Sequence, residues 1–201
     1  MLFRSLTRRP PATVIGRRVV GEQIDTVMVD DGVGVRLVLD HLASLGHRRI
    51  AHVDGGIGAG SDSRRDAFLA NARSLGLVPS VVEGDFTEAA GLASIDRLMS
   101  IAPRPTAVFA GNDLLAIGVM AGLQDRGLRV PEDVSVVGFD NTFVSALRHV
   151  ALTSVDQPTR RLGEIAVGLL HERLHSGRVE PRHETIQPTL VRRTTTGPAP
   201  A

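Results

Sequence analysis

The 201-residue sequence contains no cysteine, lysine, tryptophan or tyrosine. The absence of cysteine excludes a disulfide scaffold, a thiolate metal site and a cysteine nucleophile. Only six phenylalanines remain for aromatic stacking, too few for an extended single-stranded nucleic-acid platform. No apolar run approaches the ~20 residues of a membrane span, so we expect no integral membrane protein.

Positive charge is supplied by arginine alone. All 23 basic residues are arginines, and 22 acidic residues leave a formal net charge of +1. A balanced chain lacks the basic footprint of a nucleic-acid-binding protein. Arginines also gather, without acids, in residues 1–18. We interpret this start as solvated chain leading into a first strand, rather than as a transit peptide, and expect a cytoplasmic protein.

Short apolar segments alternate with helical patterns along the chain, and 42% of the residues are hydrophobic. This alternation predicts an α/β fold, in which a parallel sheet is covered by helices on both faces. Buried parallel strands are expected at 13–16, 26–29, 49–54, 80–82, 106–110, 134–140 and 152–155. Helices are expected at 33–45, 62–75, 88–101, 113–126 and 158–176.

Residues suited to helix ends flank the helical patterns. Gly46, Gly76, Gly127 and Gly177 follow four of the five, and glycine reaches the left-handed conformation that terminates a helix. Thr87 precedes the helix expected at 88–101 and suits its N-cap.

Two sequence motifs resemble those of known functional sites, but the residue spacing of one and the helical phase of the other do not fit such a site. The glycine-rich run 55–60 lies between a strand and a helix, but Ser61 stands where a dinucleotide loop needs its third glycine. We favour a flexible loop that contacts a ligand. His171 and His175 belong to a literal H-E-x-x-H, yet they fall on the polar face of their helix. We therefore expect no zinc there and no enzymatic activity.

Polar and aromatic side chains follow several of the expected strands. Asn112 and Asp140 come at the ends of two strands, Arg64 opens the helix after the glycine-rich run, and Phe86 follows another strand. In open parallel sheets, ligands bind beyond the carboxyl ends of the strands. Carboxylate, amide and guanidinium groups can hydrogen-bond a polyol, while a phenyl ring can stack on a sugar. The alternative is that Asn112 and Asp140 merely cap helices.

Four ordered stretches spanning most of the chain resemble the lactose-repressor (LacI/GalR) family of transcription regulators. They are 40–51 (DHLASLGHRRIA), 105–113 (PTAVFAGND), 127–140 (GLRVPEDVSVVGFD) and 190–195 (LVRRTT). The resemblance implies a periplasmic-binding-protein-like sensor that binds a small sugar or nucleoside-like effector and forms a homodimer. Family members also begin with a helix-turn-helix headpiece for operator DNA, and no such pattern is found in this sequence.

The resemblance also assigns residues and boundaries. Arg64, Phe86, Asn112, Asp140 and Gln157 match effector contacts, with no metal and no cofactor. The expected organisation is a partial N-terminal subdomain, a complete C-terminal subdomain, a return to the first, C-terminal strands and a flexible tail. In the same order, these five parts comprise residues 1–29, 30–150, 151–176, 177–196 and 197–201. The alternative function is an exported periplasmic sugar-binding protein of a transporter.

Overall fold

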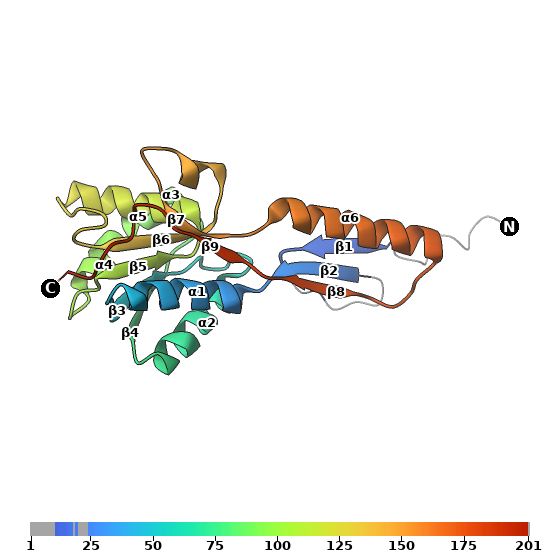
Figure 1. Ribbon diagram of the computed structural model, residues 1–201, viewed down its shortest axis with the longest axis horizontal. Helices are drawn as coiled ribbons and strands as arrows, with labels where there is room; N and C mark the ends of the chain where they lie inside the picture. The colour runs from blue at the N-terminus through green and yellow to red at the C-terminus, as the bar shows by residue number, and fades with distance from the viewer. Residues whose placement is uncertain (1–10, 18, 20–23, 201) are drawn as a thin grey trace. The chain divides into compact units, whose positions relative to one another are not determined.

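The structure, a computed structural model, describes residues 11–17, 19 and 24–200 (Figure 1). Most of the arginine-rich start, including Arg4, Arg8, Arg9 and Arg18, lies outside the described residues. The chain divides into two compact units. Unit 1 contains the described residues up to Asp30 together with Pro158–Gln187, and unit 2 contains Asp31–Gln157 together with the chain from Pro188 onward.

Unit 2 is built on a six-stranded sheet of order β4-β3-β5-β6-β7-β9. All neighbouring strands run parallel except β7 and β9. The central strands are buried on both faces, as expected for short, apolar, β-branched runs in a parallel sheet. The strands are β3 (Arg49–Val53), β4 (Val78–Val82), β5 (Ala107–Ala110), β6 (Ser135–Asp140), β7 (Thr153–Asp156) and β9 (Thr189–Val191).

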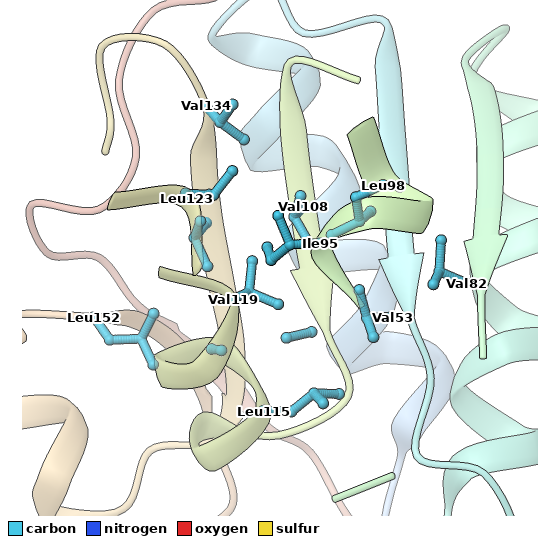
Figure 2. Packing of buried hydrophobic residues seen from close by; sticks show 14 residues of the cluster. Val53, Val82, Ile95, Leu98, Val108, Leu115, Val119, Leu123, Val134 and Leu152 are labelled. Carbon is cyan, nitrogen blue, oxygen red and sulfur yellow. The ribbon is translucent and has the colours of Figure 1, made fainter. Parts of the chain in front are cut away.

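Helices cover both faces of this sheet, which confirms the predicted α/β class (Figure 1). On one face lie α1 (Asp31–Ser44) and α2 (Ser61–Ser74), and on the other α3 (Glu88–Ala93), α4 (Ile95–Ser100) and α5 (Asp113–Asp125). Alternate strand residues supply the two cores. Figure 2 shows the core under α3, α4 and α5, with Val53 and Val108 from the strands meeting Leu115 and Val119 from α5.

The segment expected as one helix at 88–101 forms two, α3 and α4, which meet at the buried Ser94. The α3 backbone lies against α5 at two glycines. A Cβ on Gly91 would lie 2.2 Å from the carbonyl oxygen of Leu115, and one on Gly118 would lie 1.9 Å from that of Glu88. The Ser94 hydroxyl donates to the Gly91 carbonyl (2.7 Å), a bond of the kind that bends helices.

The predicted helix ends are confirmed. Gly46, Gly76, Gly127 and Gly177 all have positive φ, between 65° and 91°. The Thr87 side chain accepts a hydrogen bond from the Ala90 amide, so it caps α3. These residues terminate the helices through local conformation, which explains why the sequence pattern located them.

Unit 1 contains a three-stranded parallel sheet of order β1-β2-β8 and one helix, α6. Leu162, Ala166 and Leu169 of α6 pack on Val27 and Val29 of β2. The elements are β1 (Ala12–Ile15), β2 (Ile24–Val29), β8 (His183–Ile186) and α6 (Thr159–Ser176).

A buried ion pair lies on the same face of α6. Arg173 continues the apolar stripe by one helical turn, and its guanidinium binds the fully buried Asp25 of β2, with Nη2 2.5 Å from Oδ1. Arg178 adds a second ion pair to Asp25 at 2.8 Å. Burial alone raises the pKa of Asp25, but hydrogen bonds from Arg178 and Arg173 outweigh it and lower that pKa well below its usual value.

The C-terminal residues belong to unit 2 and are hydrogen-bonded to it. The Gly197 amide donates to the Ser135 hydroxyl at 3.1 Å, its carbonyl accepts from His47 Nε2 at 3.1 Å, and the Ala199 amide donates to Leu45 at 2.8 Å. The segment expected as a flexible tail is thus attached as far as Ala199. Residues 151–157, expected to begin the return to the other subdomain, also belong to unit 2.

Candidate functional site

The candidate site lies at the carboxyl end of the six-stranded sheet and is organised around Arg64. This residue lies in the first turn of α2 and is 7% exposed. Its Nε donates to Oδ1 of Asp31 at 2.9 Å, and its Nη1 donates to the Gly111 carbonyl at 2.7 Å. The side chain is therefore fixed by the first residue of α1 on one side and by the residue after β5 on the other.

Aromatic rings flank the guanidinium of Arg64. Its central carbon lies 3.8 Å from the ring centroid of Phe139 on β6 and 5.7 Å from that of Phe86. Both separations are within the range of a cation–π contact. These contacts add to the two hydrogen bonds, to Asp31 and Gly111, that hold the guanidinium in place.

Asp140, the last residue of β6, lies next to Arg64. Its Oδ1 is 3.8 Å from Arg64 Nη1 and accepts a hydrogen bond from Gln157 Nε2 at 2.5 Å. Burial raises the pKa of Asp140 to about 6, with Asp113 and Asp31 contributing, although Arg64 and Gln157 oppose the shift. The structure thus brings Arg64, Asp140 and Gln157 together.

The backbone is strained at this strand end. Asp140 and its successor Asn141 have φ of 103° and 47°, a region that residues with a Cβ seldom adopt. Hydrogen bonds hold Asn141 in place: its amide donates to Ser154, its Nδ2 donates to Asp156, and its Oδ1 accepts from Arg193. Strain maintained by surrounding contacts is typical of functional positions.

Phe86 is half-buried and sits on the glycine-rich run. A Cβ on Gly55 would lie 2.1 Å from the ring, and one on Gly58 would lie 2.4 Å from it. Glycine is required at both positions because any side chain would displace the ring. The glycine-rich run therefore seats an aromatic ring, which gives its glycines a role unrelated to phosphate binding.

Asn112 acts as a helix cap, one of the two alternatives considered for it. Its Oδ1 accepts from the Leu115 amide at 2.8 Å, and its Nδ2 donates to the Phe86 carbonyl at 3.2 Å. One N–H of the side-chain amide is left for a further partner. Asn112 thereby connects the start of α5 to the segment carrying Phe86.

Asp31 and Asp54 are site residues that the sequence pattern did not single out. Asp31 is the ion-pair partner of Arg64, and Asp54 Oδ1 accepts from the Gly56 and Gly84 amides, each at 3.1 Å. Asp54 directly follows β3 and Asp31 lies two residues after β2, and these positions near strand ends were the available signal. Asp54 fixes the path of the glycine-rich run beneath Phe86.

The H-E-x-x-H motif lies in α6 of unit 1. His171 and His175 are exposed, as predicted, and their rings stack with centroids 4.0 Å apart. Glu172 accepts from Arg182 at 2.7 Å. Within the described part of the chain, no group of three His, Cys, Asp or Glu residues could hold a metal ion. No helix among these residues is long and apolar enough to cross a membrane.

Comparisons with known proteins agree with this architecture. Residues 39–196 match the family of periplasmic-binding-protein-like domains. A LacI transcriptional regulator from a Rhodococcus species superposes with a TM-score of 0.91 at 38% sequence identity, over 95% of this chain and 71% of that protein. This chain belongs to the LacI family. The resemblance predicted from the four sequence stretches is thereby confirmed.

Two further similar proteins add context. The HTH-type transcriptional repressor PurR of Erwinia tasmaniensis is 36% identical over 184 residues, which are 90% of this chain but 54% of the repressor. The chain thus spans about half the length of the curated relatives it matches. A LacI-family regulator from Enterococcus faecalis, solved with bound ribose, has a TM-score of 0.84 at 26% identity, over 94% of this chain and 69% of that protein.

Proposed function

We propose that this chain is the effector-sensing part of a LacI-type transcriptional regulator and binds a sugar or nucleoside-like molecule. The observation that carries the proposal is the convergence of Arg64, Asp140 and Gln157 at the carboxyl end of one sheet. Regulators of the same family, one with bound ribose, support it. A transporter's sugar-binding protein is not favoured because the similar proteins are regulators.

In this proposal each site residue has a role set by its contacts. Arg64 and Asp140 hydrogen-bond ligand hydroxyls, and Gln157 orients Asp140 and donates with its second N–H. Phe86 packs on the ligand ring, and Asn112 donates its remaining N–H. Unlike an enzyme, the site binds its ligand without transforming it, and it needs neither metal nor cofactor.

The proposed partners follow from the family. The protein acts in the cytoplasm as a homodimer, and operator DNA is contacted by residues beyond these 201. Ligand binding shifts the population of conformations that a DNA-binding segment senses. Two facts support this: the curated relatives are called HTH-type repressors, and this chain covers only 54% of the length of the Erwinia repressor.

Calorimetry against a panel of sugars and nucleosides tests the proposal. Replacing Asp140 by Ala removes a charge-assisted hydrogen bond of ~1.5–3 kcal/mol, so affinity should fall roughly 10- to 150-fold. Asp96→Ala, at an exposed ion pair with Arg126, should leave affinity unchanged. If a ligand binds, but replacing Arg64, Asn112 and Asp140 each by Ala does not lower its affinity, the site is wrongly placed.

A further inference from the structure

The positive charge of Arg64 is already balanced within the protein. Its ion pair with Asp31 spans 2.9 Å, and the two side chains are only 8% and 15% exposed. Screening by water is weak for such a pair, so the carboxylate cancels most of the guanidinium's field. Arg64 therefore offers hydrogen-bond donors to a ligand without offering net positive charge.

A second carboxylate makes the surroundings of Arg64 negative. Asp140 lies 3.8 Å from the same guanidinium, so two carboxylates flank one cation. Burial raises the pKa of Asp140 to about 6, and the nearby Asp113 and Asp31 add to the rise, as expected where negative charge is concentrated. At pH 8 Asp140 is ionised, and an anionic ligand would be repelled.

Four backbone amides near the strand ends also donate to side chains of the protein. Such N–H groups form the anion-binding concavities of phosphate sites when they are left free. Here four such amides donate to side chains of the protein instead. Two belong to glycines that follow strands, one to the first turn of α5, and one to the residue after Asn141. The donors are Gly56 and Gly84 to Asp54, Leu115 to Asn112, and Thr142 to Asp113.

We propose that the ligand bound at Arg64 and Asp140 is an uncharged sugar or nucleoside, without phosphate or carboxylate, and that Asp31 sets this preference. Asp31 is a positioning residue, because it acts on the ligand through Arg64. The inference rests on the proposed function for the location of the site. Neutral hydroxyls can use the donors of Arg64 and the acceptor oxygens of Asp140 together.

Inorganic phosphate is the probe that tests the role of Asp31. The protein is titrated with sodium phosphate at pH 8 by calorimetry, with sodium chloride of equal ionic strength as the reference. Wild type should show no saturable binding. Asp31→Asn removes the nearer of the two carboxylates, so the group that Arg64 forms with Asp140 is neutral instead of negative. Saturable phosphate binding should then appear, at least about tenfold tighter than the detection limit of the wild-type titration, since Arg64 can donate a charge-assisted hydrogen bond to the anion.

Two variants make the test specific to the ion pair. Asp62→Asn removes another acid at the start of α2. Its side chain is 80% exposed and forms an ion pair at 2.7 Å with Arg65, the neighbour of Arg64 in the chain. It should leave phosphate binding at the wild-type level. Arg64→Gln, added to Asp31→Asn, should abolish the binding gained.

The inference is overturned if wild type binds phosphate saturably and Arg64→Gln removes that binding, or if a folded Asp31→Asn gains none. Should Asp31→Asn unfold, a wild-type titration with neutral sugars, nucleosides and their phosphates decides the question. Binding of neutral members alone supports the inference, and binding of phosphorylated members alone refutes it. If neither class of ligand binds, the proposed function is refuted, and the inference about the ligand class is refuted together with it.

Discussion

At the scale of single residues, Asp140 lowers the stability of the folded protein at neutral pH. Its raised pKa means that the folded protein holds the proton more tightly than the unfolded chain does between pH 3.8 and about 6. Ionisation of Asp140 therefore costs stability as pH rises through this range, and the cost is fully present above pH 6. Its positive φ of 103° adds to this cost.

Asp140→Asn should stabilise the protein at pH 8 by about 1–2 kcal/mol, since asparagine carries no charge. The gain should shrink as pH falls through 6 and vanish near pH 4. Urea unfolding from pH 4 to 8 measures it, with the exposed Asp96→Asn as control. A gain that is the same at every pH would contradict the role given to ionisation.

His52 gives the opposite pH dependence. It is fully buried on β3, where its ring stacks on Phe109 at 4.6 Å, and its Nε2 has no hydrogen-bond partner among the described residues. Burial lowers the pKa of His52 from 6.5 to about 4, although a hydrogen bond with the Phe109 carbonyl opposes the shift. The unfolded chain therefore takes up the proton first, and stability falls as pH drops from 6.5 towards 4.

Replacing His52 by Leu should reduce this acid sensitivity by up to about 3 kcal/mol between pH 7 and 4, while costing about 1 kcal/mol at pH 7 for the hydrogen bond lost. Denaturant melts at each pH give the slope. His171→Leu, at an exposed histidine, should keep the wild-type slope. An unchanged slope in His52→Leu would show that other groups cause the acid sensitivity.

At the scale of elements, α3 and α5 depend on glycine for their close approach. Gly118→Ala would place a methyl 1.9 Å from the Glu88 carbonyl oxygen, so the two helices would have to separate. We expect a loss above about 3 kcal/mol, at the upper end of overpacking costs. Gly163→Ala, in α6 with nothing within 4 Å, should instead gain about 0.5–1 kcal/mol. Thermal unfolding of both variants measures whether each substitution lowers or raises stability. Equal effects of the two substitutions would contradict the role given to Gly118.

The sequence predicted those elements whose signals are local. Seven strands and the helix-ending glycines lie where apolar periodicity and left-handed turns placed them. The break at Ser94 could not be predicted, because it follows from the packing of Gly91 on α5, a contact between segments far apart in the chain. For the same reason the sequence indicated Arg64 and Asp140, which follow strands, but not the partnership of Asp31 with Arg64.

At the scale of the molecule, the chain leaves unit 2 after Gln157 and returns at Pro188. The two crossings lie side by side, because β7 and β9 pair antiparallel with Asp156 opposite Thr189. Joining these two residues through Asn-Gly, the preferred two-residue hairpin turn, should give a unit 2 of residues 31–156 and 189–200 that unfolds cooperatively.

Circular dichroism melts of this joined chain test whether unit 2 folds by itself. Its control is residues 31–157 alone, which lack β9 and the hydrogen bonds of Gly197 and Ala199. The control should melt at a lower temperature or without a cooperative transition. Equal melting of the two chains would show that β9 and the C-terminal residues contribute little.

The late position of β8 and β9 along the chain also determines the order of events during synthesis on the ribosome. Domains generally fold as units as they emerge. Here β2 cannot pair with β8 until residues 183–186 have been synthesised, and β7 cannot pair with β9 until residues 189–191 have been synthesised. Until these segments leave the ribosome, both units therefore present unpaired strand edges, which can pair with other chains, so the nascent chain is more prone to aggregation than the folded protein.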